Sequence, residues 1–303
     1  MDFDVIVIGS GPAGGRAAIE CAKAGLKTAV FDKEALPRRK VCAGGLVKRA
    51  LAYLPDDFEL PYLSRCDTVE MHMQSAKQPF RETREHLITM VSRVDFDYAL
   101  VKHAARFGAQ ICSETAVLEV CPHDEYVEVV TDQRRYKARY LVLAEGANAR
   151  LSNQFWPDDR VLIPALESEV FLPPEAMARY AGVARFDFDV LPSGYGWLFP
   201  KGDHVSVGIG SFAKKNEHLQ KLFDDYKVTL GLPPNALERN RRGYIIPIKP
   251  RQGPMMKQRM LLVGDAAGFA DPVTAEGFSY AIKSGLEAGR AIVTGQSPEE
   301  VGE

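Results

Sequence analysis

The chain has 303 residues, of which 46% are hydrophobic, and its formal net charge is −2 at pH 7. This length and composition predict one large or two modest packed domains and exclude a disordered chain, while the nearly neutral charge gives no reason to expect a nucleic-acid partner. No apolar stretch approaches the ~20 residues that span a bilayer, and the first residues do not resemble a secretory leader, so we expect a cytoplasmic protein, with peripheral contact to a membrane left open.

The first predicted unit is strand, turn, helix and strand over residues 3–32, with the sequence "FDVIVIGSGPAGGRAAIECAKAGLKTAVFD". Residues 5–8 form the short apolar run that is typical of a strand buried in a parallel sheet. The helix places small apolar residues such as Ala17 and Cys21 on one face, and Gly25 fits its C-terminal end. The second strand ends at Asp32.

The turn of this unit carries three glycines at G-x-G-x-x-G spacing. Such glycines permit a tight turn, close approach of the backbone to a pyrophosphate, and close packing of helix on strand, while the helix N-terminus attracts the phosphate charge. An acid at the end of the second strand is placed to accept hydrogen bonds from ribose hydroxyls. The unit therefore predicts dinucleotide binding, the alternative being an ordinary strand–helix turn. The residues expected at the dinucleotide are Gly9, Gly11, Pro12, Ala13, Gly14, Asp32 and Lys33.

Further along the chain, strands and one helix are expected to alternate. Residues 66–73 ("CDTVEMHM") are expected to form a strand of a second sheet. Ser92 and Asp95 form a possible capping box for a helix that ends near residue 107, before Gly108. Strands follow at 126–130 and 136–144.

From residue 161 the pattern changes to alternation with period 2, which predicts half-buried antiparallel strands. Residues 183–190 ("VARFDFDV") set apolar Phe186 and Phe188 against Asp187 and Asp189, and 204–210 ("HVSVGIG") set Val and Ile against small residues. A short helix is expected at about 216–228. We predict a discontinuous dinucleotide-binding domain (residues 1–63, 92–157 and 244–303) and an inserted antiparallel β-rich substrate domain (64–91 and 158–243).

Near the C-terminus, a strand at 260–263 runs into Gly264 and Asp265, and Pro272 precedes a helix expected from about residue 274. The Asp265 carboxylate is placed to bind a second polyol, and the helix N-terminus would favour the negative charge of a reduced flavin. Two acid-bearing turns at opposite ends of the chain suit FAD, which has both a ribose and a ribityl chain, better than a nicotinamide dinucleotide. The alternative is a C-terminal helix that only packs on the sheet.

Three other groups of residues indicate no further site. The five cysteines and six histidines have no metal-ligand spacing, so we expect no metal site and no disulfide framework. The short basic groups "PRRK" at 37–40 and "RNRR" at 239–242 are interpreted as solvated surface.

Four motifs carry a resemblance to a known family: "GSGPAG" at 9–14, "KVCAGGL" at 40–46, "GYGWLFPKGD" at 194–203 and "GDAAGFADPVTAEGFSYAIKSG" at 264–285. The chain resembles the geranylgeranyl reductases, within the p-hydroxybenzoate hydroxylase-like flavoproteins. The resemblance implies an α/β fold with a Rossmann-type FAD-binding domain. Arg93 matches an arginine that contacts FAD in relatives, and Glu145–Gly146 resembles an Asp-Gly motif with Glu in place of Asp. The further FAD contacts expected are Cys42, Ala43, Gly44, Arg93, Glu145, Gly146, Gly264, Asp265, Pro272 and Gly277.

The resemblance also implies a reaction, the transfer of a hydride equivalent from reduced FAD to a prenyl carbon–carbon double bond. Such a bond has no carbonyl to polarise it, so a proton donor and a water-poor pocket are required. Cys42 is the expected donor, the alternative being a side chain that only packs beside the flavin. The expected substrate contacts are Gly45, Tyr195, Trp197 and Phe199, of which the three aromatic residues lie two apart and would share one face of a strand.

Several alternatives stay open. The electron donor could be NAD(P)H or a ferredoxin-like protein, because no second Rossmann motif marks a nicotinamide site. The rival functions are a flavin-dependent monooxygenase that acts on an aromatic or polyene substrate and a non-enzymatic escort protein that binds prenyl groups. A flavin halogenase is disfavoured, because the chain has no W-x-W-x-I-P run.

Overall fold

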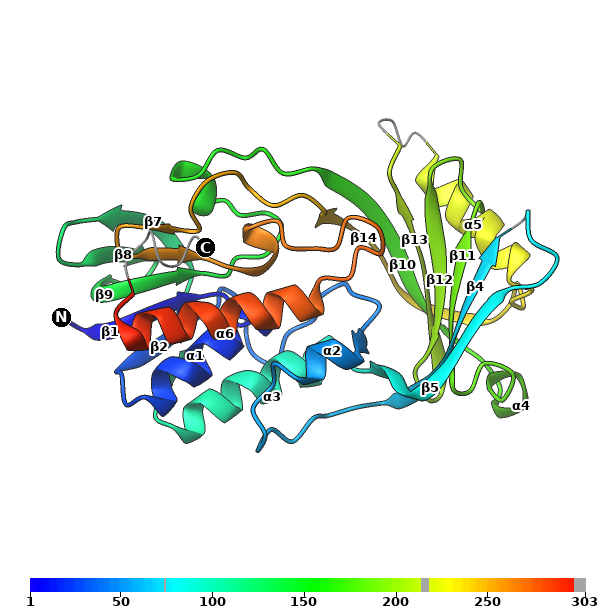
Figure 1. The fold of residues 1–303 in the computed structure, drawn as a ribbon, viewed down its shortest axis with the longest axis horizontal. Coiled ribbons are helices and arrows are strands. Elements are labelled where there is room, and N and C mark those ends of the chain that lie inside the picture. Colours follow the sequence, from blue (N-terminus) through cyan, green and yellow to red (C-terminus); the bar gives the residue numbers. More distant parts are fainter. Residues whose placement is uncertain (74, 214–217, 297–303) are drawn as a thin grey trace.

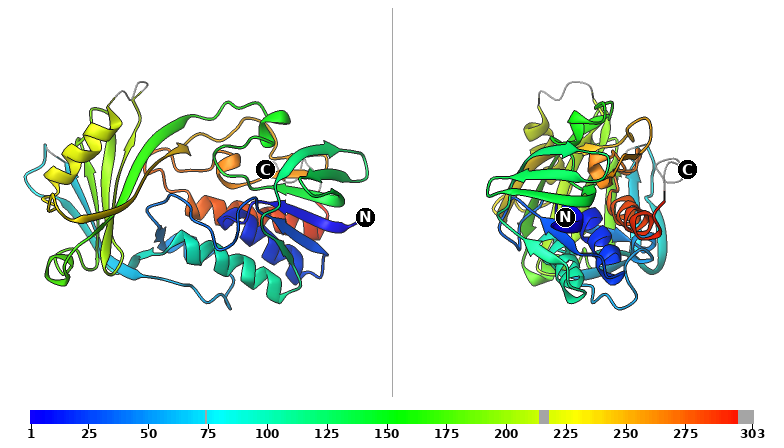
Figure 2. Two further views of the ribbon diagram at one scale, coloured as in Figure 1. Left: turned by 180° about the vertical axis from the view of Figure 1, so that it is seen from behind. Right: turned by 90° about the vertical axis from the view of Figure 1, so that its left-hand side faces the viewer.

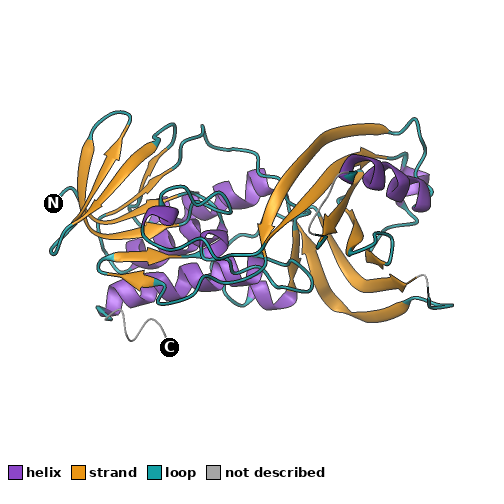
Figure 3. Ribbon diagram, turned by 90° about the horizontal axis from the view of Figure 1, so that it is seen from above, coloured by secondary structure: helices purple, strands orange, loops and turns teal. Residues whose placement is uncertain are grey.

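The computed structural model describes residues 1–73, 75–213 and 218–296. Two eight-stranded sheets lie at opposite ends of an elongated molecule, and long helices lie beneath the first sheet (Figures 1 and 3). The two termini of the described chain belong to the part that contains the first sheet (Figure 1). None of the helices in the described ranges has the length and apolar character needed to cross a membrane.

The first sheet is built around β1, whose core-forming residues are fully buried and which pairs in parallel with both β2 and β9. Its order is β15 (Met256–Lys257), β16 (Met260–Leu262), β9 (Arg135–Leu143), β1 (Phe3–Ile8), β2 (Thr28–Phe31) and β6 (Gln110–Cys112). The antiparallel pair β7 (Val117–Pro122) and β8 (Val127–Thr131) extends from β9. This arrangement confirms the predicted α/β fold with a parallel Rossmann-type sheet.

Three helices lie side by side against this sheet: α1 (Pro12–Lys23), α3 (Arg93–Arg106) and α6 (Phe278–Thr294) (Figures 1 and 2). The glycines of α6 let it approach α1 closely, because a Cβ on Gly285 would lie 2.1 Å from the carbonyl oxygen of Ala13. The two ends of the chain are therefore packed together, and this contact brings the two predicted glycine-rich turns to the same side of the sheet.

The second sheet has the order β14 (Leu237–Pro247), β10 (Leu162–Phe171), β13 (His204–Ser211), β12 (Gly194–Pro200), β11 (Val183–Phe188), β4 (Ser64–Met73), β5 (Phe80–Met90) and β3 (Gly45–Val47). The short helix α2 (Lys48–Leu51) follows β3, α4 (Pro174–Met177) follows β10, and α5 (Leu219–Thr229) contacts β10 and β13. The two 3-10 turns, η1 (Ser152–Gln154) and η2 (Gly264–Ala266), belong to the part with the first sheet.

The second sheet is rich in antiparallel pairs, as predicted, and it also contains a parallel pair. Strand β11 pairs in parallel with β4, which comes from a distant part of the chain. The expected exposure of the acidic face of β11 is wrong, because Asp187 is buried, accepts hydrogen bonds from Arg185, and accepts one from the Tyr226 hydroxyl of α5 at 2.8 Å. Helix α5 covers this face of the sheet. The Asp187 carboxylate is therefore hydrogen-bonded by Arg185 and Tyr226 instead of by water.

Other element boundaries differ from those expected. Ser92 is the N-cap of α3, but its side chain makes no capping hydrogen bond, so the predicted capping box does not form. Helix α6 begins at Phe278 rather than near residue 274, because Asp271 accepts hydrogen bonds from the backbone of Val273 and Thr274 in a separate turn. Helix α5 begins at Leu219, and residues 216–217 of its expected range lie outside the described residues.

The second sheet also includes a segment that was expected in the dinucleotide-binding domain. Strand β3 pairs with β5, so residues 45–47 are hydrogen-bonded to the substrate-side sheet. The "KVCAGGL" loop therefore joins the two parts of the molecule.

Candidate active site

A large cavity of about 1730 Å³ lies between the two sheets. One wall is formed by the ends of β1 and β2, the loop at 38–45 and the start of α3, and the opposite wall is formed by one face of the second sheet. Loops at 144–151 and 265–277 complete it. Segments from both ends of the chain thus meet at one cavity, as the two glycine-rich turns predicted.

The first glycine turn has the predicted close contacts. Gly9 has φ +103°, and a Cβ on Gly14 would lie 1.9 Å from the Gly9 carbonyl oxygen, so helix and strand could not pack with a larger residue there. A Cβ on Gly11 would meet only ordinary contacts, and its nearest neighbours are guanidinium nitrogens of Arg38 and Arg93, each at 3.8 Å. Two cations therefore lie beside the N-terminus of α1, where backbone N–H groups attract anions.

Asp32 lies at the predicted position and belongs to a charged network. Its Oδ2 accepts hydrogen bonds from the Ser10 backbone at 3.1 Å and from Arg38 Nε at 2.8 Å, and its Oδ1 accepts one from the Glu34 backbone at 3.0 Å. Burial favours the neutral acid, but the charge of Arg38 and these hydrogen bonds hold the pKa of Asp32 below its usual value. The carboxylate therefore stays ionised and can accept hydrogen bonds from hydroxyl groups.

The Arg93 side chain forms a bidentate ion pair with Asp97, with both nitrogen–oxygen distances at 2.8 Å. Arg38 also reaches Asp97, at 3.3 Å. The interpretation of "PRRK" as solvated surface is wrong for two of its residues: the Arg38 side chain is 11% exposed, and burial lowers the pKa of Lys40 to about 8. These two cations were missed because their acidic neighbours, Asp32, Asp97 and Asp265, are recognisable only in the folded chain.

The second glycine turn contributes Asp265, which lines the cavity. Burial raises the pKa of Asp265, although the nearby charges of Lys40 and Arg93 act in the opposite direction. Gly277, the N-cap of α6, lines the same cavity. Four predicted contacts do not line it: Ala13, Gly14, Gly264 and Pro272.

Glu145 has a structural role that the sequence did not indicate. Its two carboxylate oxygens accept hydrogen bonds from the backbone of Leu151 and of Ser152, each at 2.8 Å, and one of them also accepts from the Ser152 hydroxyl. Although Glu145 and Gly146 line the cavity, this carboxylate holds the turn at η1 in place. A direct contact with a cofactor stays a prediction.

The loop with Cys42 and Ala43 lies where the two walls of the cavity meet. The Cys42 backbone N–H donates to Glu167 Oε1 at 2.8 Å. Gly44 has φ +78°, and a Cβ there would lie 2.2 Å from the Val91 carbonyl oxygen, so this position requires glycine. Burial raises the pKa of the Cys42 thiol, which the charge of Arg93 partly offsets, so the thiol keeps its proton at neutral pH.

The second-sheet wall of the cavity is largely apolar. Tyr195, Trp197 and Phe199 lie on one face of β12 and line the cavity, as the spacing predicted. A Cβ on Gly208 of the neighbouring strand would collide with the Trp197 ring, so glycine at that position makes room for the indole. Other apolar residues of this wall include Val69, Met71, Leu87, Ile88, Phe186 and Ile246.

The residues on the first-sheet side fit the expected FAD. A pyrophosphate requires unoccupied space beside a helix N-terminus and cations, which Gly11, Arg38 and Arg93 provide. Ribose and ribityl hydroxyls require acceptors, and Asp32 and Asp265 line the cavity on separate turns. The cavity is also large enough for an extended dinucleotide together with a second molecule.

Comparison with protein families decides the class of the chain. A family model described as "Pyridine nucleotide-disulphide oxidoreductase" matches residues 3–159, the segment that contains the first glycine turn, Cys42 and Arg93. The chain belongs to this family. The expected oxidoreductase class is thereby confirmed, and the FAD expectation agrees with the family and the fold.

The resemblance of this oxidoreductase to geranylgeranyl reductases is also confirmed. The chain is 33% identical to an uncharacterised protein of Methanosarcina barkeri, over 96% of the chain and 74% of that protein. It is 30% identical to the chloroplastic geranylgeranyl diphosphate reductase of Nicotiana tabacum, over 96% of the chain and 66% of that enzyme. The chain thus spans about two thirds to three quarters of the length of these relatives.

Solved structures agree with the fold of the oxidoreductase. A geranylgeranyl bacteriochlorophyll reductase-like protein from Thermoplasma acidophilum superposes with a TM-score of 0.84 at 24% identity, covering 96% of this chain and 78% of that one. A mutant of the halogenase PltM, in complex with FAD, superposes with a TM-score of 0.77 at 18% identity, covering 97% of this chain and 70% of that one. At these identities the structures show a shared fold.

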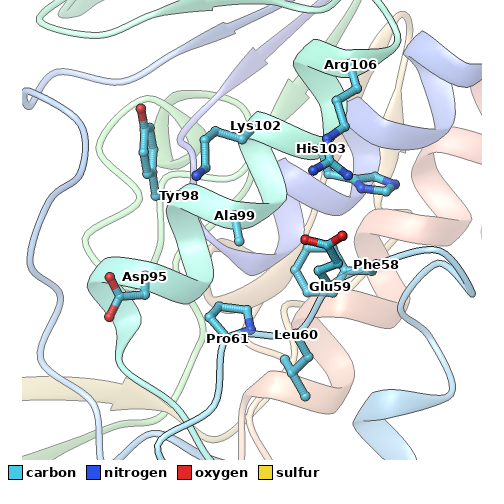
Figure 4. A pocket seen from close by; sticks show the side chains of 10 residues that line it. All are labelled: Phe58, Glu59, Leu60, Pro61, Asp95, Tyr98, Ala99, Lys102, His103 and Arg106. Atoms are coloured by element: carbon cyan, nitrogen blue, oxygen red, sulfur yellow. The ribbon is translucent and has the colours of Figure 1, made fainter.

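A second, smaller cavity of about 470 Å³ lies between α3 and the loop at 58–61 (Figure 4). Figure 4 shows Lys102 and Arg106 on α3, with Glu59 and Pro61 on the facing loop. This cavity contains none of the predicted site residues. The described residues of the oxidoreductase also include no cluster of three His, Cys, Asp or Glu side chains that could hold a metal ion.

Proposed function

We propose that the protein is an FAD-dependent oxidoreductase that reduces carbon–carbon double bonds of a prenyl substrate of the geranylgeranyl type. One observation carries the proposal: the polar dinucleotide-type turns and the apolar aromatic wall line the same cavity, and the Cys42 loop lies where they meet. The name of the tobacco relative, a geranylgeranyl diphosphate reductase, supports the substrate class.

The proposed roles of the residues follow from the chemistry of each wall of the cavity. Bound FAD, in its reduced form, supplies a hydride. Arg38, Arg93 and the N-terminus of α1 would hold the pyrophosphate, and Asp32 and Asp265 would accept hydrogen bonds from the ribose and the ribityl chain. The aromatic wall would bind the prenyl chain and exclude water from the double bond.

The proton is proposed to come from Cys42. An isolated double bond cannot stabilise the carbanion left by hydride addition, so the second carbon must receive a proton in the same step or before it. The Cys42 thiol stays protonated because burial raises its pKa. Its place between the two walls of the cavity supports this role.

An anaerobic reoxidation experiment tests the proposal. The FAD-loaded protein is reduced with dithionite and mixed with a geranylgeranyl substrate or with its fully saturated analogue. We expect the yellow absorbance to return only with the unsaturated substrate. Absorbance that stays bleached until oxygen is admitted would favour a monooxygenase, and purified protein that takes up no FAD would favour an escort protein.

The proposed partners follow from the same reaction. The reducing equivalents would come from NAD(P)H or from a ferredoxin-like protein, and stopped-flow reduction of the bound flavin by each donor distinguishes them. Because prenyl lipids reside in membranes, we also propose a cytoplasmic protein in peripheral contact with a membrane surface.

The aromatic wall gives a testable prediction. Trp197→Ala removes an indole that lines the cavity, so the affinity for a long prenyl chain is expected to fall by roughly 10-fold or more, corresponding to about 1.4 kcal/mol. The affinity for a short chain, which covers less of the wall, should change by less than about 2-fold. Isothermal titration of the FAD-loaded protein measures both affinities.

Phe188→Ala is the matched control, because Phe188 packs against the same cluster without lining the cavity. It should leave both affinities near those of the wild type. Equal affinities of the Trp197 variant and the wild type for long and for short chains would refute the proposed role of the wall.

A further inference from the structure

Glu167 is a half-buried acid in the middle of β10 to which the proposed mechanism gives no role. It lines the same cavity as Cys42 and the aromatic wall. In the sheet it lies opposite Gly208 of β13 on one side and Arg242 of β14 on the other. Burying a carboxyl group costs free energy unless the group is hydrogen-bonded or paired, so the partners of both oxygens matter.

The two oxygens of Glu167 have different surroundings. Oε1 accepts the hydrogen bond from the Cys42 backbone at 2.8 Å, which fixes the carboxyl group beside the residue that carries the thiol. Oε2 is buried and has no hydrogen-bond partner among the described residues. A group that served only to hold the loop would need one oxygen, so the second is free for a partner that is present only during the reaction.

The charges around Glu167 come from every element packed against it. Burial raises the pKa of Glu167, whereas the nearby charge of Lys201 lowers it and that of Glu169 raises it. The group is therefore more readily protonated than an ordinary glutamate and can act as a proton donor. The other charged or titratable groups near Glu167 in the cavity are Lys40, Cys42, Arg93, Arg242 and His204.

The proposed reaction leaves Cys42 in need of a proton. When the thiol gives its proton to the substrate carbon, it becomes a thiolate in surroundings that oppose its charge, because burial raises the pKa of this thiol. A neighbouring carboxylic acid is then a better proton source than water, because it is the stronger acid and its carboxyl group is held beside residue 42.

We propose that Glu167 supplies the proton that restores the Cys42 thiol in each catalytic cycle. The inference rests on the proposed function. In the first step the S–H bond of Cys42 breaks as a C–H bond forms. In the second step the O–H bond of Glu167 breaks as the S–H bond reforms, and the resulting carboxylate then takes a proton from solvent water. Glu167 thus acts through Cys42 and does not need to touch the substrate.

Glu167→Gln tests this role. The amide oxygen can still accept the Cys42 hydrogen bond, but the side chain has no acidic proton. Glu169→Gln is the matched control, because Glu169 lies two residues along the same strand and contacts Arg39 and Asn240 instead of Cys42. Melting temperatures of both variants establish that they fold.

The first measurement needs no substrate. The rate at which iodoacetamide alkylates Cys42 is followed against pH by mass spectrometry of the Cys42 peptide, in the FAD-loaded protein. A Glu167 carboxylate repels the thiolate and raises its pKa, so Glu167→Gln should move the midpoint to lower pH by about half a unit or more. Glu169→Gln should move it by less. Identical midpoints in the wild type and Glu167→Gln would overturn the inference.

The second measurement is turnover. Glu167→Gln should lower kcat by roughly 10- to 100-fold, while KM changes by less than about 2-fold. The wild-type kcat should decline as pH rises through the pKa of Glu167, and this decline should be absent from the variant. A variant with wild-type kcat and an unchanged pH profile would contradict proton supply by Glu167. If the wild type saturates no prenyl chain, the proposed function fails, while alkylation still decides whether Glu167 and Cys42 are coupled.

Discussion

Cys42→Ser is expected to slow prenyl saturation by roughly 100-fold or more while FAD stays bound, because general-acid catalysis contributes about that much. Serine is close to cysteine in size, and the backbone N–H at residue 42 still donates to Glu167. The hydroxyl, however, is a far weaker acid than the thiol. Single-turnover reoxidation of the reduced protein by a prenyl substrate, followed by absorbance, measures the rate of the step.

Cys121→Ser is the control for this prediction, since Cys121 lies on β7 and does not line the cavity. It should react at the wild-type rate. A Cys42→Ser protein that turns over as fast as the wild type would remove Cys42 from the mechanism and leave it as a packing residue of the loop.

Gly11→Ala is expected to weaken FAD binding by roughly 100-fold, or about 2.7 kcal/mol, without unfolding the protein. A Cβ at this position meets ordinary contacts in the protein and points to the cations Arg38 and Arg93, where the pyrophosphate would lie. The melting temperature of the FAD-free protein should stay within about 2 °C of the wild type. Fluorescence titration with FAD and thermal unfolding measure the two effects.

Gly14→Ala separates the cofactor effect from the folding effect. Its Cβ would lie 1.9 Å from the Gly9 carbonyl oxygen, so strand and helix must move apart. Such overpacking costs about 3 kcal/mol and should lower the melting temperature of the FAD-free protein by about 5 °C. If the two glycine variants instead show the same loss of stability and the same FAD affinity, the pyrophosphate does not bind at Gly11.

The features that the sequence predicted are local ones. The β1–α1–β2 unit and its turn depend on residues within one short segment, and Gly9 and Gly14 have the contacts that their spacing indicates. The shared face of Tyr195, Trp197 and Phe199 follows from the period of a strand and needs no tertiary information. The C-terminal turn was found because an acid follows a short strand there too.

The features that the sequence missed depend on contacts between distant segments. Arg38 looks like a surface cation until Asp97, 59 residues away, is placed beside it. Glu167 looks like the exposed position of an alternating strand, and its contact with Cys42 joins residues 125 apart. Likewise, Asp187 is buried only because α5 covers its face of the sheet. A carboxylate within a strand was the available signal, but it did not identify the partner.

The most direct test of the account is the mass of the product. The FAD-loaded protein, reduced with dithionite, is incubated without oxygen with a geranylgeranyl lipid, and the lipid is analysed by mass spectrometry. The account predicts a gain of two hydrogen atoms for each double bond reduced, and no gain when FAD is omitted. A lipid of unchanged mass, or one that gains an oxygen atom once air is admitted, would contradict it.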